Sequence, residues 1–556
     1  MSQYTIGLDF GTNSCRCIII DTNNGKEISS YVHNYKFGKN GVITSKKNPL
    51  VARQHPKDYT DSIIKGIKGS IQNAGKRFNK KKIIGIGIDT TGSSPMPIDS
   101  NGNPLVYSKE FSNNINSLVW LWKDHTSYLE AEKITEIAKK IRPEYLQKCG
   151  EKYSSEWFWS KIWHLKKIDP ILFKNIYSFV EICDYLPAYL SGNSHPSKIK
   201  RSACAAGHKA MFNYEWGGLP DKNFLKKLDP ELAQLRDRLY DTVYNPEESA
   251  GNLSEYWSKK LGLNTGIKIN IGGFDAHIGA IGAGIKTGKL VKIMGTSTCD
   301  IVIQSSKKII NSLPGICGIV ENSVMSNHYG IEAGQSAVGD IFASFINNDV
   351  AESYGKNFKQ KFKNLEKLAE KILPGKHGLL ALDWHNGNRT ILVDTMLTGL
   401  ILGKTLNTKP EEMFKALIEA TAFGCLKIIN QIEKYKIKIN EIIAIGGLTK
   451  SSLIMQVYAD VTGRKIKTLK SNQVCAVGAG ILASIPTNKT NYNNLKYFQN
   501  KMSVKTKKIY KPKKLNNKIY SKLYALYSDI HDAFGTNNKP IILHHVMKDL
   551  IRLRDN

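Results

Sequence analysis

The chain has 556 residues, of which 41% are hydrophobic and 23% charged, a composition typical of a globular protein rather than a disordered one. Its 79 Lys and Arg residues against 48 Asp and Glu residues give a net charge of +31, and no run of about 18 apolar residues predicts a membrane span. This length exceeds what one core usually organises, so we expect two large domains.

The excess of lysine favours either a nucleic-acid partner or a solvated basic surface. The lysines are spread along the whole chain, often beside Asn and Ile as in residues 80–84, and no nucleic-acid-binding motif accompanies them. We therefore predict a solvated surface that attracts anionic nucleotides modestly, without a nucleic-acid or membrane partner. The nine cysteines include no Cys-x-x-Cys pair, and the N-terminus enters a predicted strand without an apolar leader, so we expect a cytoplasmic setting rather than secretion.

The N-terminal residues predict a hairpin with a polar turn. Residues 4–9 form a short apolar run that ends in Asp9, residues 10–14 turn, and residues 15–21 return. Asp9 then lies at the end of a strand, beside the hydroxyl and N–H groups of the turn. A carboxylate in this position suits Mg²⁺, usually through water, while the turn suits phosphate oxygens.

The same pattern of strand and polar turn recurs along the chain. We expect a helix at residues 59–78, then a buried strand at 83–89 that again ends in Asp. In the second half, a strand at 290–294 is followed by a Gly-Thr-Ser-Thr turn and a returning strand at 299–304. Later, a strand at 441–445 leads through a Gly-Gly turn into a helix at 451–461, capped by Ser451. Two halves with this pattern predict a duplicated α/β fold with a cleft between the copies.

Asp275 is the main candidate for chemistry, in the glycine-rich and largely apolar stretch 269–300. No Lys or Arg lies within several residues of it, so a local ion pair does not explain the carboxylate. An acid here can accept a proton from a docked molecule, and the turn at 295–298 suits a phosphate. A base beside a phosphate turn points to phosphoryl transfer to a hydroxyl. The alternative is a helix-capping Asp and an ordinary hairpin turn.

The region between the halves is less regular. Residues 118–126 and 155–168 predict aromatic-rich helices whose tryptophans are core residues. Residues 201–211 look loop-like, and Lys209 among them is either an ordinary surface lysine or a ligand contact. Glu332 precedes a Gly-containing turn and a helix, so it is either a helix-start charge or a hydrogen-bonding partner for sugar hydroxyls.

These segments together resemble the FGGY carbohydrate kinases of the actin-like ATPase superfamily, and the ribulokinases most closely. The resemblance rests on GLDFGTNS, IDTTGS, WLWKDHT, SEWFWSKIW, CAAGHKAM, GGFDAHIGAIGAG, GTSTCDI, EAGQSAVGD, LDWHNGNRT and ALIEATAFG, in that order over most of the chain. It implies an α/β protein with two actin-like (ribonuclease H-like) domains and an ATP and sugar cleft between them. The implied domains are an N-terminal sugar-binding domain at 1–270 and a C-terminal nucleotide-binding domain at 271–486. We interpret residues 487–556 as a basic extension with one packing helix, expected at 518–534.

The resemblance implies a role for each matching position. Asp275 is implied to be the general base, and Asp9 the residue that positions Mg²⁺. The residues implied to hold the sugar are Ser94, Lys209, Asp275 and Glu332. Those implied to bind ATP are Thr12, Asn13, Ser14, Gly295, Thr296, Gly334, Gly446 and Gly447.

One departure concerns residues 122–126. Many family members have Trp-x-Asp-x-Arg there, and this chain lacks the Arg, which counts against glycerol kinase-like and xylulokinase-like specificity. The implied activity is ATP-dependent phosphorylation of the terminal (5-) hydroxyl of L-ribulose, giving L-ribulose 5-phosphate and ADP in arabinose catabolism. The alternatives are an FGGY kinase for another ketopentose or pentitol, such as D-ribulose or ribitol, and a catalytically silent actin-like nucleotide sensor. The oligomeric state stays open, with a homodimer as one form.

Overall fold

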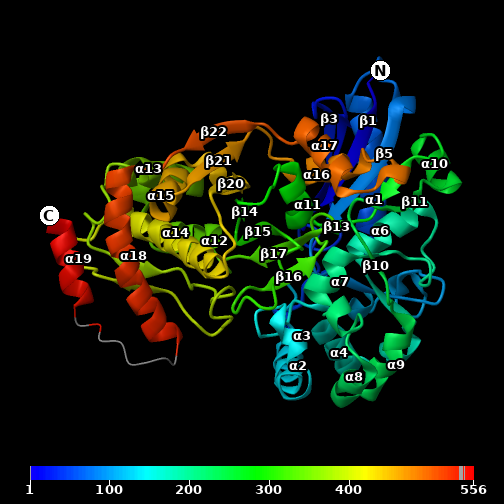
Figure 1. Cartoon of the computed structure of the whole chain (residues 1–556), viewed down its shortest axis with the longest axis horizontal. Helices are drawn as coiled ribbons and strands as arrows, with labels where there is room; N and C mark the ends of the chain where they lie inside the picture. Colours follow the sequence, from blue (N-terminus) through cyan, green and yellow to red (C-terminus); the bar gives the residue numbers. More distant parts are fainter. Residues whose placement is uncertain (1, 537–542, 544, 556) are drawn as a thin grey trace.

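The computed structural model describes residues 2–536, 543 and 545–555, and it divides into two lobes that are each built on a seven-stranded sheet (Figure 1). The N-terminal sheet has the order β11 (Ser249–Asn252), β12 (Lys268–Asn270), β5 (Ile83–Thr90), β1 (Tyr4–Phe10), β2 (Ser14–Asp21) and β3 (Glu27–Asn34), and β13 (Gly273–Phe274) also pairs with β5. The C-terminal sheet has the order β16 (Gly318–Glu321), β17 (His328–Ala333), β15 (Thr298–Ser305), β14 (Lys289–Met294), β20 (Glu441–Ile445), β21 (Lys465–Leu469) and β22 (Thr506–Tyr510).

The two sheets repeat one pattern of strand pairing. β1 pairs antiparallel with β2 and parallel with β5, just as β14 pairs antiparallel with β15 and parallel with β20. The parallel part continues from β5 to β12 and from β20 to β21, and the antiparallel part from β2 to β3 and from β15 to β17. This repetition confirms the duplicated α/β fold predicted from the recurring strand and turn pattern.

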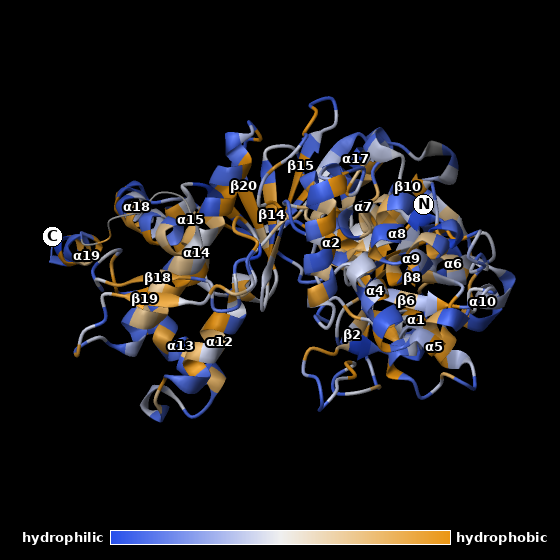
Figure 2. Cartoon of the chain, turned by 90° about the horizontal axis from the view of Figure 1, so that it is seen from below, coloured by the Kyte–Doolittle hydropathy of each residue, from blue (hydrophilic) through white to orange (hydrophobic). Residues whose placement is uncertain are grey.

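The central strands β1 and β5 are largely apolar, and they are buried along almost their whole length. Every residue of β1 after Tyr4 is buried, and so is every residue of β5 except Ile84. Helices cover both faces of such a sheet, which favours continuous apolar runs over alternation. Figure 2 shows the same apolar character for β14 and β15 near the centre of the molecule.

Helix α16 (Val474–Ala483) connects the two lobes. It forms late in the chain, yet it packs on β1 and β5 of the N-terminal sheet, beside which it lies in Figure 1. The contact depends on Gly7, Gly85 and Gly87, where an added Cβ would lie 1.9 to 2.1 Å from carbonyl oxygens of the helix. Only glycine at these positions lets the helix backbone approach the sheet so closely.

Helix α11 (Asp275–Gly282) lies against α16 at a similarly short distance. A Cβ on Gly478 would lie 1.9 Å from the Ile278 carbonyl oxygen, and one on Gly282 would lie 2.0 Å from that of Val474. The pair α11 and α16 therefore forms a rigid layer between the two sheets, and it carries Asp275 at its edge.

Several predicted elements are confirmed with shifted ends. The helix expected at 59–78 is α1 (Pro56–Asn73), and the one expected at 155–168 is α4 (Phe158–Ile168). The helix expected at 451–461 is α15 (Ser452–Thr462), and the Ser451 hydroxyl caps it by accepting a hydrogen bond from the Ile454 N–H at 3.1 Å.

The helix predicted at residues 118–126 is wrong. The segment instead contains β7 (Val119–Trp120), which pairs with β4 (Arg53–Gln54). The Arg53 guanidinium lies 3.3 Å from the centre of the Trp120 ring, so the tryptophan is a core residue as predicted, but in a strand. Packing against a distant segment decided the local conformation here.

The loop predicted at residues 201–211 is also wrong. After β9 (Arg201–Ser202), which pairs with β10 (Val243–Tyr244), the chain forms helix α7 (Ala203–Lys209). The small residues of this helix let it pack closely on β16 of the C-terminal sheet. The small side chains of this segment led us to predict a loop, but in the structure they allow α7 of one lobe to pack closely on β16 of the other.

The remaining elements surround the two sheets. In the N-terminal lobe they are β6 (Pro95–Ile98), α2 (Tyr128–Ile141), α3 (Glu144–Gln147), α5 (Pro170–Asn175), β8 (Ser178–Glu181), α6 (Ile182–Ser191), α8 (Lys222–Leu228), α9 (Pro230–Leu235) and α10 (Glu255–Leu261). In the C-terminal lobe they are α12 (Gly339–Asn348), α13 (Phe358–Ala369), β18 (Leu380–Leu382), β19 (Leu400–Leu402) and α14 (Pro410–Lys434).

The C-terminal extension contains more than the single packing helix that we expected. It supplies α17 (Tyr492–Met502), the edge strand β22, α18 (Lys514–Gly535) and α19 (Val546–Asp555). Buried residues of α18, Tyr520, Leu523 and Tyr527, attach it to the C-terminal core. None of the helices in the described part of the chain combines the length and the apolar character that a membrane crossing requires.

Candidate active site

A cleft of about 260 Å³ between the lobes brings together predicted site residues from both halves of the chain. The N-terminal half and α11 contribute Thr12, Lys209 and Asp275, and the C-terminal lobe contributes Gly295, Thr296 and Glu332. The convergence of residues so far apart in the sequence makes this cleft the candidate active site.

Three carboxylates reach one edge of the N-terminal sheet. Asp9 lies opposite Asp89 in the parallel pair β1 and β5, and Gly273 of β13 also lies opposite Asp89. Asp275 follows β13 directly as the first residue of α11. Parallel strands present their carboxyl ends at the same edge, where ligands bind in α/β proteins.

Asp275 has the properties of a general base. It is not the N-cap of α11, because Phe274 occupies that position without a side-chain cap. Its Oδ1 accepts a hydrogen bond from the Ala276 N–H at 2.7 Å. Burial, reinforced by the Asp9 carboxylate, raises the pKa of Asp275 to about 7. A carboxylate with this pKa can take up a proton at neutral pH and release it again.

Asp9 is buried behind the cleft and has a basic partner. Its Oδ2 accepts a hydrogen bond from Arg16 Nη1 at 3.1 Å. Burial raises the pKa of Asp9, and Arg16 offsets part of that rise. Arg16 was not predicted as a site residue, although it lies directly opposite Asp9 in the register of the first hairpin. That register was the signal in the sequence that could have found it.

The turn between β14 and β15 forms the opposite wall of the cleft. The Gly295 N–H donates to the Ser297 carbonyl at 3.0 Å, which closes the turn. Gly446, at the end of the neighbouring strand β20, lies beside this turn, because a Cβ on it would lie 2.5 Å from the Met294 carbonyl oxygen. Gly446 and Gly447 therefore adjoin the turn, but they are not among the described residues that line the cleft.

Lys209 and Glu332 form an ion pair across the cleft. Lys209 Nζ lies 3.1 and 3.2 Å from the two carboxylate oxygens, and both side chains are largely buried. The ammonium also lies 5.5 Å from the Trp157 ring centre and 5.7 Å from that of Phe274. Burial acts to raise the pKa of Glu332, but the Lys209 ammonium holds it well below its usual range.

This pair excludes the two ordinary interpretations of its residues. Lys209 ends helix α7 and is 6% exposed, so it is not a surface lysine. Glu332 lies in strand β17, so it is not a helix-start charge. The pair offers a hydrogen-bond donor and an acceptor to a polar ligand in the cleft.

Besides Asp9, Gly446 and Gly447, three further predicted site residues of the N-terminal lobe, Ser94, Asn13 and Ser14, lie outside the cleft lining. Ser94 is fully buried and donates its backbone N–H to Glu181 Oε2 at 2.7 Å, while Thr91 lines the cleft instead. Asn13 Nδ2 donates to a backbone carbonyl at 2.6 Å, and Ser14 begins β2. Ser94 therefore lies behind the cleft wall, whereas Asn13 is exposed and Ser14 is half-buried.

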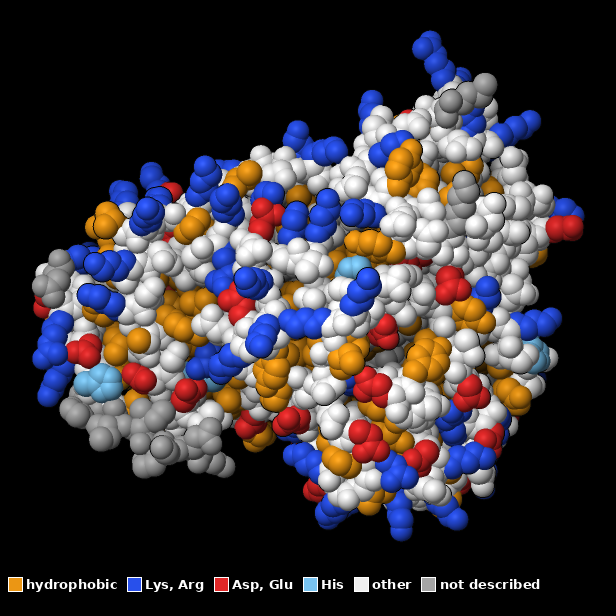
Figure 3. Space-filling model, in the orientation of Figure 1, with side chains coloured by type: hydrophobic (Ala, Val, Ile, Leu, Met, Phe, Trp, Pro, Cys, Tyr) orange, Lys and Arg blue, Asp and Glu red, His pale blue; other side chains and the backbone are white. Residues whose placement is uncertain are grey.

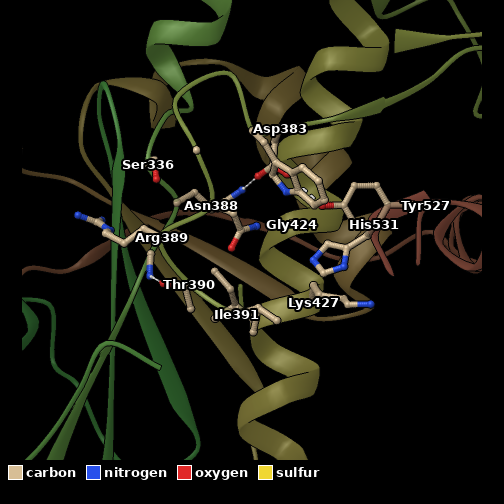
Figure 4. Close-up of a pocket in the computed structure, with 15 residues that line it drawn as sticks. Ser336, Asp383, Asn388, Arg389, Thr390, Ile391, Gly424, Lys427, Tyr527 and His531 are labelled. Carbon is tan, nitrogen blue, oxygen red and sulfur yellow. Dashed lines mark hydrogen bonds between the residues drawn. The ribbon is translucent and has the colours of Figure 1, made fainter. Parts of the chain in front are cut away.

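Gly334 lines a separate pocket of about 10 Å³ in the C-terminal lobe (Figure 4). Asp383 in this pocket accepts a hydrogen bond from the Tyr527 hydroxyl at 3.0 Å. Arg389 borders both the pocket and the cleft, and its Nη2 donates to the Thr298 carbonyl at 2.6 Å. Figure 4 shows Arg389 pointing away from Asp383 and Tyr527. The pocket and the cleft are therefore neighbours that share one guanidinium group.

The cleft also contains residues that sequence reasoning did not select. They are Trp122, Glu156, His277, Arg389 and Cys475. Trp122 Nε1 donates to the Thr12 hydroxyl at 3.1 Å and so holds the turn between β1 and β2. All of them except Cys475 lie within the motifs that carried the family resemblance, and a polar or aromatic residue inside such a motif is the signal that could have found them.

Two family models match the chain. Residues 4–282 match the N-terminal domain of the FGGY family of carbohydrate kinases, and residues 290–486 match the C-terminal domain of that family. The chain is 39% identical over 570 residues to a ribulokinase of Shouchella clausii, with 100% of this chain and 98% of the relative covered. It is 38% identical over 544 residues to a ribulokinase of Vibrio parahaemolyticus, with 95% of each covered.

Solved structures share the fold. A ligand-bound xylulose kinase from Lactobacillus acidophilus superposes with a TM-score of 0.77 at 21% identity, covering 96% of this chain and 99% of that one. Plasmodium falciparum glycerol kinase with ADP superposes with a TM-score of 0.76 at 16% identity, covering 95% and 98%. At these identities the likeness concerns the fold alone. The two domain matches and the full-length relatives show the family, and the chain belongs to the FGGY family of carbohydrate kinases.

Proposed function

We propose that this sugar kinase transfers the γ-phosphoryl group of ATP to the terminal (5-) hydroxyl of L-ribulose, giving L-ribulose 5-phosphate and ADP in arabinose catabolism. The ribulokinases that match over the whole chain support this substrate. The observation that carries the proposal is the location of Asp275. This buried carboxylate, with a pKa of about 7, shares one cleft with a glycine turn and a buried ion pair.

The residues of the cleft divide the reaction between them. Lys209 donates to a sugar hydroxyl and Glu332 accepts from one, with Ser94 supporting this side through the chain around Thr91. Asp275 takes the proton from the terminal hydroxyl while the oxygen of that hydroxyl bonds to the γ-phosphorus. The bond from the γ-phosphorus to the bridging oxygen breaks, and ADP leaves with that electron pair. Holding the two substrates in line is the larger part of such catalysis.

The nucleotide side of the cleft is built from N–H groups and hydroxyls. Thr12 and the turn containing Gly295 and Thr296 face the phosphates and stabilise the charge that spreads over the transferring group. We assign the neighbouring Asn13, Ser14, Gly334, Gly446 and Gly447 to the rest of the nucleotide.

A divalent cation fits the chemistry of the residues behind the turn. The carboxylate of Asp9 supplies the hard oxygen donor that Mg²⁺ prefers, and Mg²⁺ when bound neutralises phosphate charge. Asp9 holds that ion in our proposal, either directly or through water.

We keep the domain division of 1–270, 271–486 and 487–556 as part of this proposal, with the sugar on the first domain and the nucleotide on the second. A cytoplasmic location is supported by the nine cysteines, which form no disulfide although all of them are described.

The test is ADP release with Mg·ATP and L-ribulose, D-ribulose, D-xylulose, ribitol, glycerol or no sugar, with Asp275→Asn as the control. Turnover on L-ribulose that disappears in the variant supports the reaction, the substrate and the base together. Turnover on another member of the panel alone keeps the mechanism and overturns the substrate. Absence of turnover with ATP still bound would make the protein a nucleotide sensor.

A further inference from the structure

Asp89 is a carboxylate that the mechanism above does not use. Its side chain is fully buried, and apart from the adjoining Asp9 carboxylate neither of its carboxylate oxygens has a hydrogen-bond partner among the described residues. Asp9 beside it differs, because one of its oxygens accepts from Arg16. Buried carboxylates are normally paired or hydrogen-bonded, so an unsatisfied one calls for a ligand.

The position of Asp89 places it beside the candidate cation residue. Asp9 and Asp89 lie opposite each other in the parallel register of β1 and β5. One carboxylate oxygen of Asp9, one of Asp89 and the sulfur of Cys475 all lie within 4.8 Å of one another. Oxygen ligands lie about 2.1 Å from Mg²⁺, so one ion can reach both carboxylates, either directly or through a water. A thiol is a poor ligand for Mg²⁺, which leaves the two carboxylates as the relevant pair.

The local charges also favour a cation. Of the groups that act most strongly on Asp89, the carboxylates of Asp9 and Asp275 repel its negative charge, and Arg16 attracts it. One guanidinium therefore faces several carboxylates, and a divalent cation supplies the missing positive charge.

We propose that Asp89 and Asp9 together bind the divalent cation that accompanies the nucleotide, and that Asp89 is the second protein ligand of that ion. The inference rests on the proposed function, because it concerns the cation used with ATP. It leaves Asp275 without a metal-binding role and free to act as the base.

The direct test is Mn²⁺ binding, measured by electron paramagnetic resonance without sugar or nucleotide. We expect the wild-type chain to bind Mn²⁺ and Asp89→Asn to bind it at least about tenfold more weakly, since even changes to residues behind metal ligands cost that much. Asp61→Asn is the matched control. Asp61 lies on α1, where it pairs with Lys57 at 3.4 Å, and its loss removes the same charge outside the cluster.

Thermal unfolding separates a ligand from a structural residue. In metal-free buffer, Asp89→Asn should unfold at the same or a higher temperature than wild type, because it removes an unsatisfied buried charge. Added Mg²⁺ should raise the unfolding temperature of wild type and of Asp61→Asn more than that of Asp89→Asn. Asp89→Ser should repeat both results with a smaller side chain.

These measurements test whether Asp89 is a metal ligand, whatever the sugar substrate is. Equal Mn²⁺ affinity in wild type and Asp89→Asn would overturn it, as would weaker folding of the metal-free variants. Weak binding in every variant, wild type included, would also overturn it and leave Asp9 and Asp89 as a pair that shares a proton. Loss of Mn²⁺ binding in Asp89→Asn alongside no turnover on L-ribulose would refute the proposed substrate and keep the metal ligand.

Discussion

The Nε2 atoms of His208 and His277 lie 3.0 Å apart, with both rings buried between α7 and α11. A hydrogen bond at this distance needs a lone pair on one ring, so the two imidazoles cannot both be protonated. Burial lowers the pKa of His277 to about 4, and burial followed by His277 lowers the pKa of His208 well below its usual range. Both histidines are therefore neutral in the folded protein at neutral pH.

This pair should make the protein sensitive to acid. Histidines in the unfolded chain take up protons near pH 6.5, whereas in the fold His277 resists protonation until about pH 4, and the pKa of His208 is lowered as well. The contribution of His277 to stability is therefore fully present above about pH 6.5 and is lost as the pH falls from there towards 4. We expect the free energy of unfolding to fall by about 1.4 kcal/mol per pH unit for His277 across that range, and His208 to add to the loss. Urea unfolding at several pH values measures it.

The matched variants for this prediction are His277→Gln and His195→Gln. His195 is exposed, so its replacement should leave the slope of stability against pH unchanged. His277→Gln should reduce the slope. An equal slope in wild type and His277→Gln would show that this pair does not control acid sensitivity.

Asp275→Asn tests the base directly. The amide keeps the shape of the side chain but cannot accept the proton, so we expect kcat to fall by about 10²–10⁴. The dissociation constant of ATP should change little, because Asp275 acts on the hydroxyl. Steady-state kinetics measure kcat, and nucleotide titration measures the dissociation constant of ATP. Near-normal turnover in the variant would remove Asp275 from this role.

The pH dependence of the reaction should report the same residue. Because its pKa is raised to about 7, Asp275 is protonated and inactive as a base at lower pH and ionised at higher pH. We therefore expect kcat/KM for the sugar to rise up to about pH 7 and then to level off, since this parameter follows the free enzyme. A profile that stays flat from pH 5.5 to 8 would contradict the assignment.

Lys209→Ala should weaken sugar binding more than ATP binding. A charged hydrogen bond contributes about 1.5–3 kcal/mol, so we expect the KM for the sugar to rise at least about tenfold, with a smaller change for ATP. Equal changes in both KM values would indicate a structural lysine. The single variant also leaves Glu332 buried without its partner, which costs about 3–5 kcal/mol of stability. The double variant Lys209→Met with Glu332→Gln should recover stability but not sugar affinity.

The glycines under α16 should tolerate no side chain. A Cβ on Gly87 would lie 1.9 Å from the Ala479 carbonyl oxygen. Gly87→Ala should therefore lower the free energy of unfolding by about 1–3 kcal/mol, the usual cost of overpacking. Gly447→Ala is the control, because nothing lies within 4 Å of a Cβ there. A Gly87→Ala variant as stable as Gly447→Ala would show that the helix shifts without cost.

The sequence predicted the sheets better than the segments between them. The strands predicted at residues 4–9 and 290–294 are short apolar runs bounded by turn residues, and they correspond to β1 and β14. That local pattern suffices when both faces of a strand are buried. Trp120 and helix α7 were misassigned because their conformation depends on partners that are distant in the chain, namely Arg53 and strand β16.

The candidate site also contains residues that the sequence could indicate and contacts that it could not. Asp9 could be found because it ends a predicted apolar strand, and Asp275 because it is a lone carboxylate in a glycine-rich, largely apolar stretch. The pairing of Lys209 with Glu332 joins residues 123 positions apart, and no spacing in the sequence indicates it. Asp89 carried the same signal as Asp9, a strand that ends in Asp, but only the structure shows that, apart from Asp9, its oxygens have no partner among the described residues.

The packing of α16 on the N-terminal sheet affects how the chain folds while it is being synthesised. The strands of the N-terminal lobe leave the ribosome before the helix that covers their glycine face, because that helix is made only when residues 474–483 appear. A nascent chain that stops at residue 282 would contain the whole N-terminal family match and would still lack the helix that covers the glycines of β1 and β5. Completion of the first lobe must therefore wait for the second.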